Sequence, residues 1–293
     1  MTANSGRYDA VSLGILWDRL VSIADEIVST LVRTSFSTIV SESYDLTVVV
    51  LDRDGRLMAQ GSYSVPVFIG TAPRTLRYML EKFPPETLRP GDVICTNDPW
   101  MGTGHLFDIN VMRPVFRNEE IVGYTMSITH LPDIGGMGFG AAASEIFHEG
   151  LRLPICKLVR EGEPDPFILE LVRTNVRTPD ATVGDLMANV TCNEVGGRQL
   201  LEFMDEYQMH NLEVLAEVIQ NRAEKAMRDA VSTLPDGVYE GEIWGDGVEE
   251  PEKYPIRLAI EGDELTVDFE GAPPQKDRGG SNCTLSYTQG HTL

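Results

Sequence analysis

Two copies of one short motif are the residues best suited to chemistry. The chain reads His-Leu-Phe-Asp-Ile from His105 and His-Leu-Pro-Asp-Ile from His130, although it has only 5 histidines. Neutral imidazole nitrogens and carboxylate oxygens together suit Zn, Mn or Fe(II). One His-x-x-Asp is more often a hydrogen-bonded pair, but two copies predict a divalent metal site formed by His105, Asp108, His130 and Asp133.

A β-hairpin would bring the two motifs together. Residues 110–116 and 121–129 read as strands, and 117–120 read as the turn between them. In a hairpin centred on Glu119, Asp108 lies opposite His130 and His105 lies opposite Asp133. The two imidazoles and two carboxylates would then meet at one end of the hairpin. Pro114 limits the first strand to an edge or an irregular position.

Further polar and glycine residues flank the motifs. Glu145 and Glu149 are candidate proton shuttles, and their spacing would place them on one helix face, although solvated charges are the commoner outcome. Asp98-Pro99 favours a turn. The glycines permit close approach of a ligand to the backbone or form a mobile loop; they are Gly102, Gly104, Gly135, Gly136, Gly138 and Gly140.

Several other kinds of site are missing from the sequence. It has no GxxxxGK[ST] loop, no GxGxxG at a strand end and no GxSxG elbow, so any ATP would be bound by another chain. The four cysteines lie far apart without a CxxC pair, which argues against a disulfide framework and a zinc ribbon and makes a reducing cytoplasm the expected location. They are Cys95, Cys156, Cys192 and Cys283.

The elements that must position these residues are of both kinds and segregated along the chain. Residues 11–32 predict an amphipathic helix, 45–59 a hairpin, and 71–83 a short helix. A helical tract follows from 179 to about 232, interrupted near 196–197 and around 209–211. This order predicts an α+β fold with mixed and antiparallel strands and a segregated block of helices.

We expect three segments. Residues 1–178 would form a mixed α/β domain that carries the metal-binding hairpin, and residues 179–234 a helical segment. Residues 235–293 would form a β-rich segment, the start of a domain truncated at its C-terminus.

Composition narrows the functional classes. With 42% hydrophobic and 24% charged residues, the chain is neither disordered nor fibrous. Its net charge of −21 argues against binding to nucleic acid or anionic lipid through overall charge. No apolar run is long enough to span a membrane, and no signal peptide is visible. Most negative charge lies in 161–270, as a solvated face or as a docking surface for a basic partner.

Beyond the two motifs, the chain resembles the hydantoinase B/oxoprolinase family from end to end. The resemblance rests on residues 97–100 (Asn-Asp-Pro-Trp), 129–136 (Thr-His-Leu-Pro-Asp-Ile-Gly-Gly) and 145–154 (Glu-Ile-Phe-His-Glu-Gly-Leu-Arg-Leu-Pro). It implies one subunit of an ATP-dependent, hetero-oligomeric enzyme acting on small cyclic amides such as N-methylhydantoin or 5-oxoproline. The expected partner is a hydantoinase A-type subunit that binds ATP.

The resemblance also implies a site assignment and leaves two alternatives open. His105, Asp108 and His130 would ligate the catalytic metal, with Asp133 as fourth ligand or in a supporting position. Acetone and acetophenone carboxylases use similar subunits, so the chain could instead belong to a carboxylase acting on a ketone. A non-catalytic scaffold that docks the ATP-binding subunit is the second alternative.

Overall fold

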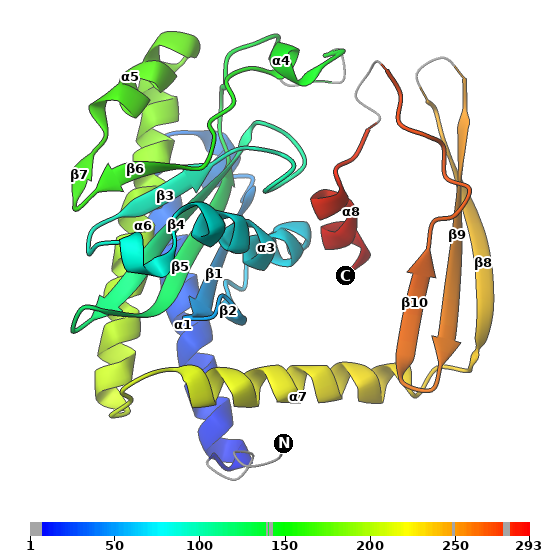
Figure 1. Ribbon diagram of the computed structural model, residues 1–293, viewed down its shortest axis with the longest axis horizontal. Coiled ribbons are helices and arrows are strands. Elements are labelled where there is room, and N and C mark those ends of the chain that lie inside the picture. Colours follow the sequence, from blue (N-terminus) through cyan, green and yellow to red (C-terminus); the bar gives the residue numbers. More distant parts are fainter. Residues whose placement is uncertain (1–7, 139, 141–142, 248–249, 278–281) are drawn as a thin grey trace.

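A seven-stranded sheet covered by helices on both faces forms the main body, and a long helix leads from it to a separate three-stranded sheet (Figure 1). The structure is a computed structural model that describes residues 8–138, 140, 143–247, 250–277 and 282–293. Runs of strands such as β3–β5 (93–130) and β8–β10 (237–268) are separated by helices, including the run α5–α7 (166–231), without regular βαβ units, which confirms the predicted α+β class. In these described ranges, no helix combines the length and hydrophobicity needed to cross a bilayer.

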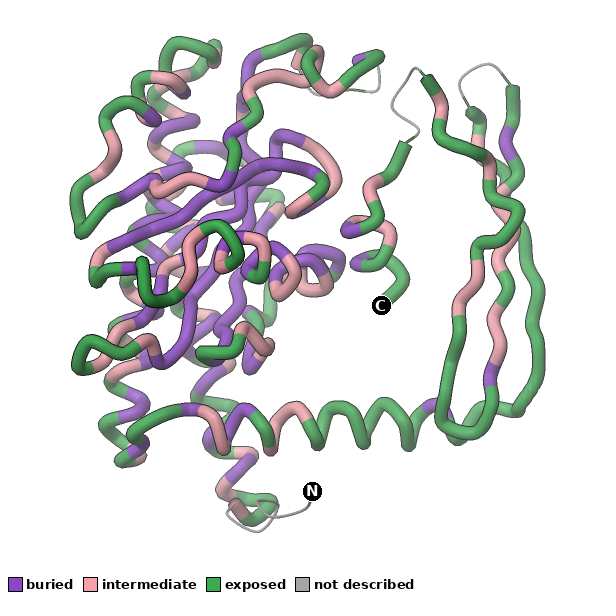
Figure 2. The backbone as a smooth tube through the Cα atoms, in the orientation of Figure 1, coloured by how far each residue is buried: buried purple, intermediate pink, exposed green. Residues whose placement is uncertain are grey.

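The large sheet has the order β2-β1-β5-β4-β3-β6-β7, and its pairings among the described residues are all antiparallel. All seven residues of β1 are buried, as expected for an apolar strand covered on both faces (Figure 2). The strands are β1 (Leu46–Asp52), β2 (Leu57–Gln60), β3 (Val93–Thr96), β4 (Asp108–Arg117), β5 (Glu120–His130), β6 (Cys156–Arg160) and β7 (Glu163–Pro164).

Helices α1 (Ala10–Thr34) and α6 (Pro179–Glu206) cover one face of the sheet, and α3 (Pro66–Lys82) covers the other. Helix α1 begins where the Asp9 carboxylate accepts hydrogen bonds from the first turn. Its buried apolar residues recur every three or four positions, as the sequence predicts. The shorter helices are α2 (Thr38–Ser41), the 3-10 turn η1 (Pro85–Thr87), α4 (Ile146–Glu149) and α5 (Pro166–Asn175).

Helix α6 runs without a break through Gly196-Gly197, so the interruption predicted there is wrong. A Cβ at Gly196 would lie 2.2 Å from the Ile27 Cδ1 atom of α1. The glycine therefore allows α1 and α6 to pack closely, and does not end a helix. The second predicted interruption is confirmed, because α6 ends at Glu206 and the next helix, α7 (Glu213–Val231), begins at Glu213.

A buried polar network fixes α6 on β5. The Asn189 side chain accepts a hydrogen bond from the Ser127 hydroxyl at 2.7 Å and donates to the Thr129 hydroxyl at 2.9 Å. One turn later, Asn193 Nδ2 donates to the Ser127 hydroxyl at 2.7 Å. Because most polar groups of this network find partners inside the protein, it aligns the helix with the strand.

The described part of the C-terminal segment contains three strands, but its last element is a helix. Helix α7 leads to a largely exposed antiparallel sheet of β8 (Gly237–Gly245), β9 (Glu252–Glu261) and β10 (Glu264–Asp268) (Figure 2). Residues 285–292, predicted as part of a β-rich segment, instead form α8 (Leu285–Thr292) against α3. A Cβ at Gly70 would lie 2.8 Å from the Gly290 Cα atom, so this packing depends on glycine in both helices.

The close packing of α1 on α6 gives a first prediction. We expect Gly196→Ala to lower the free energy of unfolding by about 1–3 kcal/mol, because its methyl group would overlap the Ile27 side chain. Gly14→Ala in α1 is the matched control: its Cβ meets nothing within 4 Å, and helix propensity favours alanine by about 1 kcal/mol. Urea unfolding measures both, and equal effects would contradict the role of Gly196 in packing.

Candidate functional site

The β4–β5 hairpin has the register that the sequence predicts. Asp108 pairs with His130, and the ladder keeps this register as far as the Val115–Gly123 pair. The turn residues Asn118 and Glu119 both have positive φ, of 49° and 68°, as in the tight turns that suit twisted hairpins. Pro114 pairs with Tyr124 of β5 but lies beyond the last pairing of β4 with β3, so on the β3 side no described strand needs the N–H that proline lacks.

This register brings His105, Asp108 and His130 together. His105 Nε2 lies 3.4 Å from Asp108 Oδ2, and the His105 and His130 ring centroids are 5.3 Å apart. His105 Nδ1 accepts the Phe107 backbone N–H at 3.2 Å, which places the ring proton on Nε2, facing Asp108. In the described ranges, however, no three His, Cys, Asp or Glu side chains already form a set able to hold a metal ion.

The Asn97 side chain holds the loop that carries His105 through hydrogen bonds. Its Nδ2 donates to the carbonyls of Leu106 at 2.7 Å and Leu151 at 3.0 Å, and its Oδ1 accepts from Leu153 N at 2.6 Å. Glu149 Oε2 accepts a hydrogen bond from Leu106 N at 3.2 Å. Glu149 therefore lies next to the cluster and helps to orient the loop that carries His105.

Two other predicted residues have different surroundings. The Asp133 carboxylate accepts hydrogen bonds from Gly135 N at 2.8 Å and from the Arg177 guanidinium at 3.2 Å, and also from Arg177 N. Glu145 is exposed and pairs with His148, with 3.2 Å between Oε1 and Nε2. In this conformation Asp133 holds the loop that contains Gly135, and Glu145, which immediately precedes α4, pairs with His148 in that helix.

The structure also shows what the predicted turn at Asp98-Pro99 and one of the flanking glycines do. Asp98 accepts the Trp100 N–H at 3.0 Å in the turn that the sequence favours. Gly136 has φ of 58°, and its Cβ would lie 2.5 Å from the Glu149 carbonyl carbon. Here the glycine permits two backbone segments of the protein to approach each other.

Sequence reasoning missed two residues of the cluster, Asp45 and Tyr287. Asp45 immediately precedes β1, which pairs with β5, and its carbonyl accepts the His130 N–H at 3.2 Å. Tyr287 comes from α8, and its ring occupies the space beside Gly104, where a Cβ would lie only 2.6 Å away. Only the β1–β5 pairing and the return of α8 could have indicated them.

Burial dominates the electrostatics of the cluster. It raises the pKa of Asp108 well above its usual value, the nearby Asp45 charge raises it further, and the Thr103 hydroxyl opposes both. Burial and the neighbouring His130 lower the pKa of His105 to about 4. Burial also lowers the pKa of His130, although Asp45 opposes the shift. Both imidazoles are therefore neutral at pH 7, the form in which they bind metals.

The acidic side of the cluster lacks a strong counter-charge. Within the described residues, neither oxygen of the buried Asp108 carboxyl accepts a hydrogen bond of normal geometry, and no lysine or arginine forms an ion pair with Asp108 or Asp45. Burial and the two acidic groups raise the pKa of Tyr287 to about 12, so its phenol stays protonated. A buried carboxyl beside a second acid and two neutral imidazoles is an environment that a divalent cation would stabilise.

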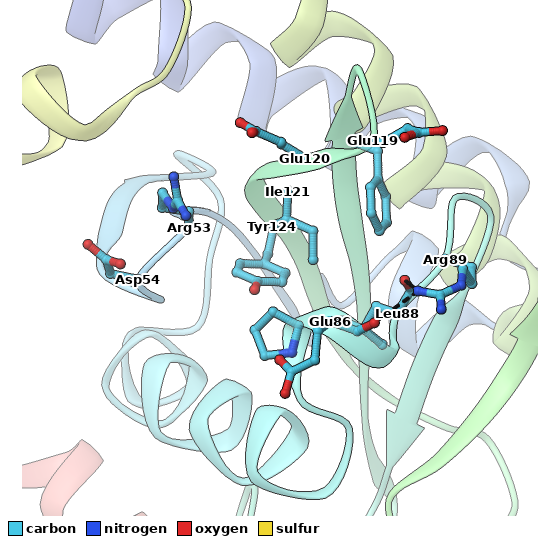
Figure 3. A pocket seen from close by; sticks show the side chains of 11 residues that line it. Arg53, Asp54, Glu86, Leu88, Arg89, Glu119, Glu120, Ile121 and Tyr124 are labelled. Carbon is cyan, nitrogen blue, oxygen red and sulfur yellow. Dashed lines mark hydrogen bonds between the residues drawn. The ribbon is translucent and has the colours of Figure 1, made fainter.

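Two hollows in the described part of the chain are not lined by His105, Asp108 or His130. One, of about 410 Å³, surrounds Tyr124 and Ile121 near the tip of the β4–β5 hairpin, with Arg53, Arg89 and Glu120 among its lining residues (Figure 3). His130 is at the opposite end of β5. The other hollow, of about 460 Å³, lies between α3 and the end of α8.

Comparisons with known proteins agree on one family. Residues 9–293 match the sequence model of Hydantoinase B/oxoprolinase. The B-type subunit of a putative D-/L-hydantoinase from Pseudomonas sp. (strain NS671) is 29% identical over 92% of this chain and 48% of its own length. The crystal structure of the ATP-dependent caprolactamase from Pseudomonas jessenii is 31% identical, with a TM-score of 0.85 over 93% of this chain and 48% of that one.

A more distant structure shares the fold. The nucleotide-free structure of acetone carboxylase is 19% identical, with a TM-score of 0.83 over 94% of this chain and 39% of that chain. The chain thus spans about half the length of the hydantoinase and caprolactamase chains that it matches.

The buried Asp108 carboxyl gives a second prediction. Its pKa is raised on folding, so the stability that it contributes is present below its unfolded pKa of 3.8 and is lost as pH rises through the folded pKa. Metal-free Asp108→Asn avoids this loss. Above about pH 4, we expect its free energy of unfolding to exceed that of metal-free wild type by a growing margin, above about 1 kcal/mol. Urea unfolding across pH measures this, and a margin independent of pH would contradict it.

Proposed function

Because this chain belongs to the hydantoinase B/oxoprolinase family, we propose that it is a subunit of an ATP-dependent hydrolase of cyclic amides. The names of its relatives support this reading: one is a B-type hydantoinase subunit and another an ATP-dependent caprolactamase. Hydantoins and caprolactam share a ring amide, so we propose a small cyclic amide as the substrate class. We propose this activity for the whole enzyme and not for this chain alone, since the chain spans about half the length of these two relatives.

The ATP-binding partner that we propose is a hydantoinase A-type subunit. The relatives include proteins named as the B-type subunit of a hydantoinase and the beta subunit of a caprolactamase, names that imply a further subunit. The sequence of this chain has neither a GxxxxGK[ST] loop nor a strand-end GxGxxG motif. Activation of the amide by ATP would then occur on the partner, and this chain would supply the cluster at the end of the β4–β5 hairpin.

The observation that carries the proposal is the buried Asp108 carboxyl without a strong counter-charge. It faces His105 Nε2 at 3.4 Å, pairs with His130 across the hairpin and lies near Asp45. We propose that His105, Asp108 and His130 hold a divalent Zn, Mn or Fe ion after small side-chain rotations. Such an ion, when bound, polarises a carbonyl oxygen or lowers the pKa of a water molecule.

The surrounding residues of this chain would orient the cluster and manage protons. Phe107 stacks on His130, with centroids 5.0 Å apart and planes at 22°, which fixes the plane of the imidazole. Tyr287, protonated at neutral pH, is a hydrogen-bond donor beside the two acids. Glu149 would shuttle a proton from its position beside the His105 loop. The same role for Glu145 requires it to leave His148.

Two other functions would give different results. A carboxylase subunit acting on a ketone would need bicarbonate for substrate-dependent ATP turnover, and the likeness to acetone carboxylase concerns the fold alone. A non-catalytic scaffold would bind no stoichiometric metal.

Metal analysis of purified variants tests the site. We expect about one ion per wild-type chain, and its loss from His105→Ala and Asp108→Ala. Asp133→Ala should keep the ion, because the Asp133 carboxylate is engaged by Arg177 and Gly135. We expect its metal affinity to fall by at most about 10–100-fold, as is typical of residues that support the ligands.

The exposed His210 provides the control, since His210→Ala should bind metal as wild type does. Equal loss from Asp108→Ala and Asp133→Ala would contradict this ligand assignment. Wild-type chain without stoichiometric metal would favour the scaffold.

ATP turnover tests the division of labour between subunits. The isolated chain should show no ATP hydrolysis that depends on a cyclic amide, because it has no phosphate-binding loop and a net charge of −21 that repels a polyanionic nucleotide. Addition of a purified hydantoinase A-type subunit should produce ATP hydrolysis that depends on the cyclic amide and does not require bicarbonate. Substrate-dependent ATPase activity from this chain alone would place the nucleotide site here and overturn the proposal.

A further inference from the structure

Two cysteines that are far apart in the sequence face each other across the large sheet. Cys95 in β3 and Cys156 in β6 are directly opposed in the antiparallel ladder, and their Sγ atoms lie 3.7 Å apart. Opposed residues of antiparallel strands have Cα separations of about 4.5–5.5 Å, within the range of about 4.4–6.8 Å found for disulfides. Bond formation at about 2.05 Å therefore needs side-chain rotation and little movement of the strands.

The two thiols differ in exposure and charge. Cys95 is fully buried, whereas Cys156 is half-buried at the first residue of β6. The hydrogen bond from Cys95 lowers the pKa of Cys156, as do the charges of Lys82 and Arg160, while burial and the Asp165 carboxylate oppose this. Cys156 is thus the thiol that an oxidant in solvent reaches in its nucleophilic form, and Cys95 is the neighbour that can resolve the product.

We propose that Cys95 and Cys156 form an oxidative modification site, at which a peroxide converts the dithiol into an intramolecular disulfide. The Cys156 thiolate attacks one peroxide oxygen, the O–O bond breaks, and the sulfur becomes a sulfenic acid while the other oxygen leaves as water after protonation. The Cys95 sulfur then attacks the Cys156 sulfur. An S–S bond forms, the S–O bond breaks, and the Cys95 proton leaves with the hydroxyl group as a second water.

Both cysteines lie close in sequence to the residues that hold the His105 loop. Asn97 follows Cys95 by two residues, and Leu153, which donates its N–H to Asn97 Oδ1 at 2.6 Å, precedes Cys156 by three. A disulfide would covalently join the two strands that lead into this network. The proposal rests on the strand geometry and on the different surroundings of the two thiols, and does not depend on the proposed function or on a metal.

Oxidation of the purified, full-length wild-type chain tests the proposal with hydrogen peroxide as the probe. After removal of reductant and brief exposure, we expect two of the four free thiols to be lost and the intact mass to fall by two hydrogen atoms. Peptide mapping should give one peptide pair, joined through Cys95 and Cys156, which dithiothreitol separates. Persistence of both thiols while the exposed Cys283 is oxidised would overturn the proposal, as would a disulfide between other cysteines.

Variants test the order of the two steps. In Cys95→Ser the sulfenic acid at Cys156 has no resolving thiol, so dimedone should label Cys156 strongly. In Cys156→Ser, the buried Cys95 should stay unlabelled. Cys192→Ser is the matched buried control, because burial raises the pKa of Cys192 to about 12, and this variant should form the disulfide as wild type does.

Because Cys95 is buried, a substitution there could disturb the fold. Circular dichroism of Cys95→Ser, and of Cys95→Ala as a second variant, checks that the loss of the disulfide does not result from misfolding. Equal dimedone labelling of Cys95 in Cys156→Ser would overturn the assignment of Cys156 as the attacking thiol.

Discussion

The candidate site depends on the register of one antiparallel strand pair, β4 and β5. Because successive side chains of a strand point to opposite faces, a slip of one residue would move Asp108 away from His130 and its neighbours. Several interactions prevent the slip: β1 pairs along most of β5, and α6 binds the Ser127 and Thr129 hydroxyls through Asn189. The tight turn at 118–119 sets the register at the other end.

Around this hairpin, distant parts of the chain converge on a pair of acids that protein groups alone do not neutralise. Asp45 comes from the start of β1, Tyr287 from α8, and the His105 loop is fastened by Asn97. Burial of Asp108 costs free energy once the carboxyl is ionised, because no described cationic side chain pairs with it. A rigid sheet can maintain such a strained electrostatic arrangement, and binding sites commonly contain one.

The same sheet explains why local patterns predict some elements and fail for others. The amphipathic α1 and the strands β4 and β5 follow from periodicity and turn residues, which act over a few positions. Gly196 resembles a helix end in the sequence, but its purpose, close contact with Ile27, is a property of two helices. Helix α8 lies in a segment predicted as β-rich, since its stability comes from packing on α3.

The sequence by itself determined the α+β class, the hairpin and the meeting of Asp108 with His130, because an antiparallel hairpin converts sequence spacing directly into spatial pairing. Only the tertiary structure decided the remaining surroundings of the cluster. It placed Asp45 and Tyr287 beside Asp108. It also paired Asp133 with Arg177 and set Cys95 opposite Cys156. Each of these contacts joins segments whose separation along the chain is unrelated to their distance in space, so no local pattern encodes them.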